Sequence, residues 1–364
     1  MNAIDLFAGA GGLSVALRES GYSIVLANEI NPKFADTHKL NFPTVPILVK
    51  DINLITKKDI ESVLNGKEVD LVVGGPPCQG FSVFGKRRFV NTKDYNPHED
   101  PRNFLVYQFI RIVEEVKPKF FFMENVKGFT NLDKGCFIEE VKKAFQKIGY
   151  QDIWWEVIHA TDYGVPQERQ RMFMIGNRLG IKFQKPKPTH HPIGSGLFPE
   201  YTTVGDAIMD LVGKENKVDN HIPLAHKPIV AARYGYVKEG GKLNVDELPP
   251  ELSAATRKDS KTGKVANYSH VFKRLSRFKP ATTMVPGHNA FPIHPTLNRT
   301  LTPREAARIQ TFPDSHIFLG TRQEQCIQVG NAVPPLMAEP FLLKIKQYIE
   351  DYNKLPQFGI RNSS

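Results

Sequence analysis

Up to about Asn177 the chain alternates short apolar runs with amphipathic segments, and this alternation constrains its fold more than any other feature. The apolar runs have the length of buried strands, and the segments between them carry apolar residues at helical spacing. This pattern predicts strands joined by crossover helices in a mostly parallel sheet. The predicted strands cover residues 3–7, 24–28, 47–50, 71–74, 120–124, 153–159 and 172–176, and the predicted helices cover 13–20, 32–41, 57–64, 104–116 and 135–148.

The last two predicted strands are joined only by residues 160–171, which are too few for a helical crossover. We therefore expect these two strands to be antiparallel. The expected fold class is α/β, with a Rossmann-like, mostly parallel sheet whose last strand is antiparallel, plus a smaller irregular domain.

After Asn177 the periodic pattern is lost, and Pro and Gly become frequent. From Arg178 to Arg299 the chain has 19 Lys and Arg against 10 Asp and Glu, so +9 of its net charge of +10 lies in one third of its length. A basic part beside a near-neutral part is typical of proteins that bind a polyanion, although a solvated lysine-rich surface is an alternative. From Leu301 the helical pattern returns, with Thr302 and Glu305 as a capping box and a last helix over about 336–352.

Composition excludes several classes of protein. No apolar run approaches the length of a membrane span and residues 1–5 do not resemble an export signal, so we expect a cytoplasmic protein with no membrane contact. Cys78, Cys136 and Cys326 are too far apart to suggest a disulfide framework or a zinc site. His190 and His191 have no carboxylate or Cys partner at a suitable spacing, so we expect a polar loop there and no metal.

Residues 74–79, Gly-Gly-Pro-Pro-Cys-Gln, follow directly on the apolar stretch 69–73. A strand delivers its last residue to the carboxyl edge of an α/β sheet, where ligands bind, and the two prolines fix the backbone. Cys78 is thus placed as a nucleophile would be. A structural buried cysteine is the alternative.

Three successive strand ends carry groups suited to an adenosine. The first strand ends in a turn with glycines at positions 9, 11 and 12, which lets a ligand approach the backbone but lacks the Gly-x-Gly-x-x-Gly spacing of dinucleotide sites. Glu29 follows the second strand and could accept hydrogen bonds from ribose hydroxyls, and Asp51 follows the third and could accept one from an adenine amino group. Each acid alone could be a solvated loop carboxylate, but together they describe a pocket that S-adenosylmethionine fits.

Two further segments carry candidate catalytic groups. Glu124 follows four apolar residues at the end of the fifth strand, where desolvation is expected to raise its pKa and make it a proton donor near neutral pH. Arg169 and Arg171 are two residues apart in an extended segment and should point to the same side, where they could bind a carbonyl oxygen or a phosphate. A capping Glu and a surface charge run are the alternatives.

Six motifs, in this order, resemble those of the DNA cytosine-5 methyltransferase family of the prokaryotic restriction–modification type. They are Asp5-x-Phe7-x-Gly9-x-Gly11-Gly12, Pro76-Pro77-Cys78-Gln79, Glu124-Asn125-Val126, Gln167-x-Arg169-x-Arg171, Arg299-x-Leu301-Thr302-x-Arg304-Glu305 and Gly330-Asn331-Ala332-Val333-Pro334-Pro335.

The resemblance implies a class I S-adenosylmethionine-dependent methyltransferase with three segments: a catalytic domain over 1–177, a target-recognition domain over 178–298, and a return to the catalytic domain over 299–364. It implies that a cytosine is rotated out of the duplex and that the Cys78 thiolate adds to C6. Glu124 would hold or protonate N3, and Arg169 and Arg171 would bind the carbonyl oxygen. The products would be 5-methylcytosine and S-adenosylhomocysteine.

By position in the motifs, the resemblance also implies binding residues. The cofactor residues would be Phe7, Gly9, Gly11, Leu13, Glu29, Ile30, Asp51, Ile52, Pro77, Leu105, Asn331 and Val333. The DNA contacts would be Ser82, Lys86, Arg87 and Thr283, with Thr282 as the competing register. The implied partners are double-stranded DNA and a cognate restriction endonuclease, and the implied protein is a stand-alone, monomeric, nucleoid-associated enzyme.

Three rival functions remain at the level of sequence. A tRNA cytosine-5 methyltransferase would carry a Cys-Phe-Thr signature, but no cysteine lies between Cys136 and Cys326. A DNA-binding module without catalysis would have no use for Cys78, Glu124 and Arg171 together. A nicotinamide dehydrogenase would need the missing phosphate-binding pattern.

Overall fold

The fold is described from a computed structural model, which covers residues 1–77, 105–244, 247–253, 272–284 and 291–354. By its internal contacts the chain forms two compact units. The first comprises Met1–Ile158, Gln170–Lys187 and Ala338–Ser364, and the second comprises His159–Arg169 and Pro188–Met337. These units divide the chain at other residues than the expected functional boundaries (1–177, 178–298 and 299–364), which stay a prediction.

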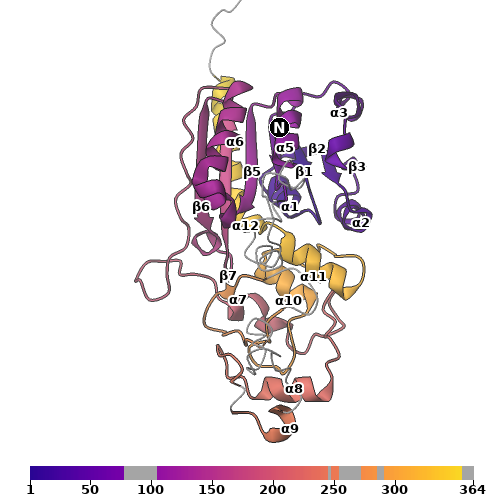
Figure 1. The fold of residues 1–364 in the computed structure, drawn as a ribbon, viewed down its shortest axis with the longest axis vertical. Coiled ribbons are helices and arrows are strands. Elements are labelled where there is room, and N and C mark those ends of the chain that lie inside the picture. Colours follow the sequence, from indigo (N-terminus) through magenta and orange to yellow (C-terminus); the bar gives the residue numbers. More distant parts are fainter. Residues whose placement is uncertain (78–104, 245–246, 254–271, 285–290, 355–364) are drawn as a thin grey trace, which may run out of the picture. The chain divides into compact units, whose positions relative to one another are not determined.

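The first unit is built on a seven-stranded sheet with the strand order β3-β2-β1-β4-β5-β8-β6 (Figure 1). The strands are β1 (Asn2–Leu6), β2 (Ser23–Glu29), β3 (Ile47–Val49), β4 (Leu71–Gly74), β5 (Phe120–Val126), β6 (Asp152–His159) and β8 (Gln170–Asn177). The strands from β3 to β5 pair in parallel, and β8 pairs antiparallel with β5. The predicted α/β class, with a mostly parallel sheet and an antiparallel strand, is confirmed.

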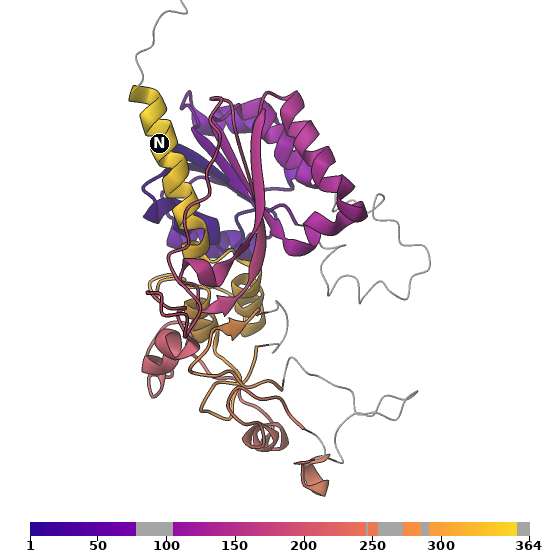
Figure 2. The ribbon, with the colours of Figure 1, turned by 90° about the vertical axis from the view of Figure 1, so that its left-hand side faces the viewer.

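Helices cover both faces of this sheet. They are α1 (Gly12–Glu19), α2 (Pro32–Asn41), α3 (Lys57–Leu64), α5 (Leu105–Val116), α6 (Cys136–Lys147) and α12 (Pro335–Lys354), with 3-10 turns η1 (Ile52–Leu54) and η5 (Lys127–Gly135). Side chains alternate along β5: Phe121 belongs to the core with Phe109 of α5 and Phe145 of α6, whereas Phe120 stacks on Tyr348 of α12. Figure 2 shows the yellow α12 and the magenta α6 on opposite sides of the sheet.

The second unit has little regular structure, as its sequence predicts. Its elements are η6 (Ala160–Tyr163), β7 (Gln167–Glu168), α7 (Val204–Ile208), η7 (Met209–Leu211), α8 (Pro228–Gly235), α9 (Pro250–Ser253), β9 (Ala281–Thr282), α10 (Pro303–Ile309) and α11 (Arg322–Asn331). Thr302 caps α10 and forms the predicted capping box with Glu305. Residues 328–331 form the last turn of α11, and residues 332–334 connect it to α12.

A buried arginine replaces part of the missing ladder of backbone hydrogen bonds in this unit. Arg274 is 5% exposed. Its guanidinium donates to the carbonyl oxygens of Tyr234, Val237, His294 and Leu297 and to Oδ1 of Asn298. Because buried carbonyl groups need partners, one fork of donors joins α8 to the segment 294–298. Across the described ranges, no helix combines the length and the apolar content needed to cross a membrane.

Candidate active site

The turn after β1 brings backbone, rather than side chains, to the carboxyl edge of the sheet. Phe7, Gly9 and Gly11 have φ angles of 58°, 56° and 96°. A bulky residue such as Phe7 rarely adopts a positive φ, and such strain is concentrated at ligand sites. A Cβ atom on Gly11 would lie 2.8 Å from the ring of Phe42, so this position requires glycine.

Glu29 is fixed against this turn before any ligand arrives. Its Oε2 accepts a hydrogen bond from the backbone N–H of Gly9, and its Oε1 accepts one from the N–H of Asn31, both at 2.8 Å. Burial raises the pKa of the Glu29 carboxyl group. Each oxygen retains a lone pair with which to accept a further donor. The next residue, Ile30, is 62% exposed and offers an apolar surface beside a buried acid.

Asp51 is positioned by the neighbouring strand end. The side-chain amide of Asn28, in β2, donates to the carbonyl oxygens of Leu48 and Lys50 and so holds the segment that leads into Asp51. Oδ1 of Asp51 accepts from the backbone and side-chain N–H groups of Asn53. Its Oδ2 takes part in neither bond.

These groups fit a nucleoside ligand. A carboxylate at each of two neighbouring strand ends supplies acceptors for hydroxyl and amino groups, Ile30 supplies an apolar face, and the turn at Gly9 and Gly11 gives access to the backbone. Leu13 and Ile52 are buried beneath the site, whereas Leu105 and Pro77 are half-buried. The described residues hold no cluster of three or more His, Cys, Asp or Glu able to bind a metal ion.

Asp5 of the first motif belongs to a buried polar chain that the sequence did not predict, together with Ser14 and His38. The hydroxyl of Ser14 donates to Oδ2 of Asp5 at 2.5 Å and lies 2.9 Å from Nε2 of His38. Burial raises the pKa of Asp5 to about 7 and lowers the pKa of His38 to about 4. Asp5, Ser14 and His38 therefore form one buried chain of hydrogen-bonding groups in which His38 is neutral near pH 7. Only the position of Asp5 inside its motif could have signalled this buried chain.

Glu124 lies where β5 ends, beside the turn that leads to Cys78. Its Oε1 is 2.8 Å from Nε of Arg171, and both side chains are nearly buried. A Cβ atom on Gly75 would lie 2.8 Å from Oε2 of Glu124, so the carboxylate packs directly on the glycine backbone. The side-chain amide of Asn125 donates to the carbonyl oxygen of Pro76. Glu124 and Asn125 thus hold both residues of the turn that precede Pro77.

Several predicted residues lie outside the described part of the chain. They are Cys78, Ser82, Lys86 and Arg87. Their predicted roles stay predictions.

Arg169 and Arg171 have different partners, although their spacing in the sequence predicted that they point to the same side. Arg171 pairs with Glu124, and burial lowers its pKa while Glu124 opposes that shift. Arg169 is 1% exposed and donates to the carbonyl oxygens of Gly330 and Ala332 at the end of α11. The N–H of Arg169 also bonds to the carbonyl oxygen of Gln167, which kinks the segment before β8 and breaks the simple alternation assumed from the sequence.

Thr283 and the last motif are placed within the second unit. The hydroxyl of Thr283, an exposed residue, donates to the carbonyl oxygen of Glu168 at 2.5 Å, next to the β7–β9 pair that contains Thr282. Asn331 is exposed at the end of α11, and Val333 is 7% exposed. No contact tests their predicted roles.

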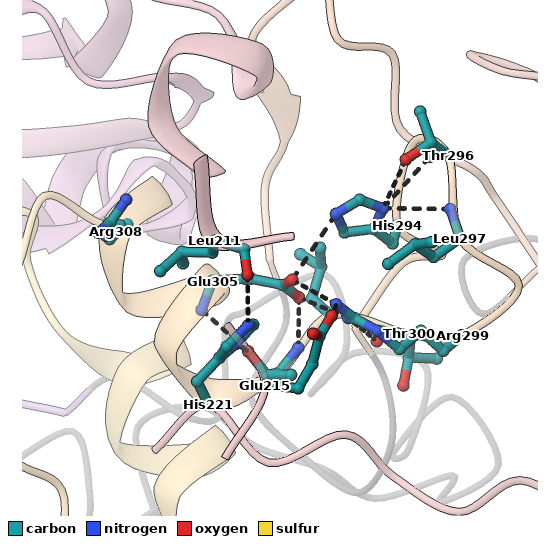
Figure 3. A network of polar contacts seen from close by, with 12 residues as sticks. Leu211, Glu215, His221, His294, Thr296, Leu297, Arg299, Thr300, Glu305 and Arg308 are labelled. Atoms are coloured by element: carbon teal, nitrogen blue, oxygen red, sulfur yellow. Dashed lines mark hydrogen bonds and ion pairs between the residues drawn. The ribbon is translucent and has the colours of Figure 1, made fainter. Parts of the chain in front are cut away.

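The motif from Arg299 to Glu305 forms a buried network in the second unit (Figure 3). The guanidinium of Arg299 makes two hydrogen bonds to the carboxylate of Glu305, at 2.7 and 2.8 Å, and lies 3.3 Å from Glu215. His294 accepts from the N–H groups of residues 296 and 297 at Nδ1, so its Nε2 carries the proton that faces Glu305, 3.6 Å away. Burial lowers the pKa of His294 to about 4. These buried contacts indicate that the motif stabilises the fold of the second unit.

The fold and the strand-end groups together define a class I methyltransferase architecture. The family of C-5 cytosine-specific DNA methylases matches residues 1–347. Type II methyltransferase M1.HphI of Haemophilus parahaemolyticus is 37% identical over 92% of this chain and 84% of its own. M.DdeI of Desulfomicrobium norvegicum is 34% identical over 97% and 90%. A prophage-encoded E. coli protein classed as a DNA modification methyltransferase has a similar structure, with a TM-score of 0.73, 26% identity, and coverage of 96% and 99%.

This chain belongs to the C-5 cytosine-specific DNA methylase family. It is a DNA (cytosine-5)-methyltransferase, as the six motifs indicated.

Proposed function

We propose that this enzyme is the methyltransferase of a type II restriction–modification system, and that it methylates one cytosine within a specific duplex sequence. The relatives at 37% and 34% identity are type II methyltransferases. The observation that carries the proposed chemistry is the Glu124–Arg171 pair, because Glu124 packs on Gly75 in the turn immediately before Cys78. The neighbouring Asn125 donates to the carbonyl oxygen of Pro76 in the same turn. The enzyme would act where the chromosome lies, in the nucleoid of the cytoplasm.

S-adenosylmethionine supplies an electrophilic methyl group when it is bound. Glu29 would accept hydrogen bonds from the ribose hydroxyls, Oδ2 of Asp51 would accept one from the adenine amino group, and Ile30 would cover the adenine ring. The turn at Gly9 and Gly11 would face the methionine part. The remaining predicted contacts are Phe7, Leu13, Ile52, Pro77, Leu105, Asn331 and Val333.

The chain's own residues act on the cytosine. The Cys78 thiolate adds to C6, which makes C5 nucleophilic, and its departure after loss of the C5 proton restores the aromatic ring. Glu124 holds a proton at N3 and so stabilises the electron-rich ring while the adduct lasts. Arg171 holds Glu124 in place and presents positive charge beside the base. In water such a pair would be weak, but burial excludes competing solvent.

The basic region from Arg178 to Arg299 supplies the electrostatic part of DNA binding, and its loops in the predicted recognition domain, 178–298, read the sequence. Ser82, Lys86, Arg87 and Thr283 would contact phosphates, which position the duplex without reading its bases.

Expression in a host without DNA methylation, followed by sequencing of 5-methylcytosine in the host DNA, tests this function. The expected result is one short sequence methylated at a single cytosine position. Methylation of tRNA in place of DNA, or no methylation by the wild type when it binds S-adenosylmethionine, contradicts it. A neighbouring gene for an endonuclease that cuts the same sequence tests the restriction–modification role, and its absence would make the enzyme a stand-alone methylase.

A further inference from the structure

Arg169 has a contact pattern that binding of a cytosine does not require. Its side chain is buried in the second unit, and one terminal nitrogen, Nη2, donates to two carbonyl oxygens, those of Gly330 at 3.1 Å and Ala332 at 2.9 Å. These two carbonyls flank Asn331. The guanidinium therefore hydrogen-bonds to the backbone on both sides of Asn331.

Gly330 and Ala332 lie at the C-terminal end of α11. The last carbonyl groups of a helix have no partner within it, and a positive charge at that end also complements the helix dipole. In α11 the amide of Gln310 donates to the carbonyl oxygen of Val329, and Arg169 takes those of Gly330 and Ala332. The direction in which the chain leaves α11 is thus set by Arg169.

The backbone of Arg169 is itself fixed. Its N–H donates to the carbonyl oxygen of Gln167, and its own carbonyl oxygen accepts from the N–H of Ala160. The next residue, Gln170, begins β8, and Arg171 in that strand pairs with Glu124. Within three residues, Arg171 thus pairs with Glu124, and Arg169 bonds to the backbone around the segment 331–333.

We infer that Arg169 is a positioning residue for cofactor binding: it holds the backbone of Asn331 to Val333 in the conformation that receives S-adenosylmethionine. This inference rests on the proposed function, because that function assigns Asn331 and Val333 to the cofactor. It replaces the earlier expectation that Arg169 contacts the cytosine carbonyl oxygen, a role that leaves Arg171 as the arginine beside the base.

The substitution R169K tests it, because lysine keeps the charge but has a shorter side chain, so its ammonium group cannot take the place of Nη2 between the two carbonyl oxygens. The matched control is R233K: Arg233 is also buried in the second unit and donates from Nε and Nη2 to one backbone carbonyl, that of Leu252. Calorimetry measures the affinity for S-adenosylmethionine, and steady-state kinetics separates kcat, KM for the cofactor and KM for DNA.

We expect R169K to weaken cofactor binding at least tenfold, to raise KM for the cofactor in parallel, and to change KM for DNA less than twofold. R233K should leave cofactor affinity within twofold of the wild type, even if it lowers the melting temperature as much as R169K does. An R169K protein with wild-type cofactor affinity and a lower kcat at saturating cofactor would overturn the inference, because that result describes a residue that acts on the base.

A measurement on the wild type covers the case in which R169K does not fold. Hydrogen exchange of the amides of residues 331 to 333 should slow when S-adenosylmethionine is added, and unchanged exchange there would refute the inference. If the wild type binds no S-adenosylmethionine at all, the proposed function fails, and not only the role of Arg169.

Discussion

Gly75 lies in the turn before Cys78 and packs directly on the Glu124 carboxylate, the group proposed to act at N3, so G75A should damage catalysis far more than folding. The added Cβ would lie 2.8 Å from Oε2 of Glu124, whereas ordinary contacts begin near 3.4 Å, so the carboxylate must yield by about 0.6 Å. Glu124 cannot simply rotate away, because Arg171 holds its other oxygen. Gly75 does not have a positive φ, so alanine introduces no backbone strain.

The two effects can be given magnitudes. A displaced reacting group costs about 100-fold in rate per 1 Å, so a shift of about 0.6 Å should lower kcat on the order of tenfold. The steric cost, about 1 kcal/mol, is offset by about 0.4–1 kcal/mol because alanine restricts the unfolded chain more than glycine does. Net stability should therefore change by less than about 1 kcal/mol.

Single-turnover methylation at saturating DNA and cofactor measures the rate, and urea denaturation measures the free energy of unfolding. G235A is the control, because a Cβ there meets its nearest neighbour at an ordinary 3.5 Å. A G75A enzyme with the wild-type single-turnover rate would refute the packing of Glu124 on this turn. A loss of stability large enough to explain the loss of activity would refute the reasoning equally.

Further predictions follow from the buried charges. R171M should lower the free energy of unfolding by about 3–5 kcal/mol because it leaves the buried Glu124 carboxylate without its partner. The double variant E124Q/R171M should lose less stability than the two single variants lose together. Additive losses in urea denaturation would contradict the ion pair. Burial holds the pKa of His294 near 4, whereas this side chain protonates near pH 6.5 in the unfolded chain. The free energy of unfolding should therefore fall by roughly 3 kcal/mol as the pH falls from 6.5 to 4. The stability difference between wild type and H294Q, followed across that range, should change accordingly, and a constant difference would show that His294 does not titrate as a buried neutral ring. R274K should weaken DNA binding without changing cofactor affinity, because lysine cannot satisfy the five acceptors that hold α8 to the segment 294–298 in the proposed recognition domain. Unchanged DNA affinity in a gel-shift titration would show that DNA binding does not depend on this buried arginine.

Much of the first unit follows from local sequence. Each predicted strand and helix of the sheet was found within a few residues, because an apolar run between amphipathic segments has one good way to be buried. The cap at Thr302 was equally local, since its partner Glu305 is three residues away. The positions of Glu29 and Asp51 at neighbouring strand ends were predictable because parallel strands deliver their last residues to one edge, whereas their roles stay predictions.

The missed features depend on partners that are distant in sequence. Arg169 meets carbonyl groups more than 160 residues away, and its backbone kink removes the alternation that suggested a pair with Arg171. The buried chain from Asp5 through Ser14 to His38 joins a strand to two helices. Pattern and spacing give the side on which a residue lies, but not the group that it meets there.

The central claim is that Cys78 bonds to the cytosine ring while Glu124 holds N3, and covalent trapping tests it most directly. A duplex with 5-fluorocytosine at the methylated position cannot lose a proton from C5, so the adduct should persist. In the presence of S-adenosylmethionine the wild type should give a protein–DNA species that survives denaturing electrophoresis, C78S should give none, and E124Q should form it more slowly. No trapped species with wild-type enzyme that methylates the ordinary duplex, or trapping that survives C78S, would contradict the account.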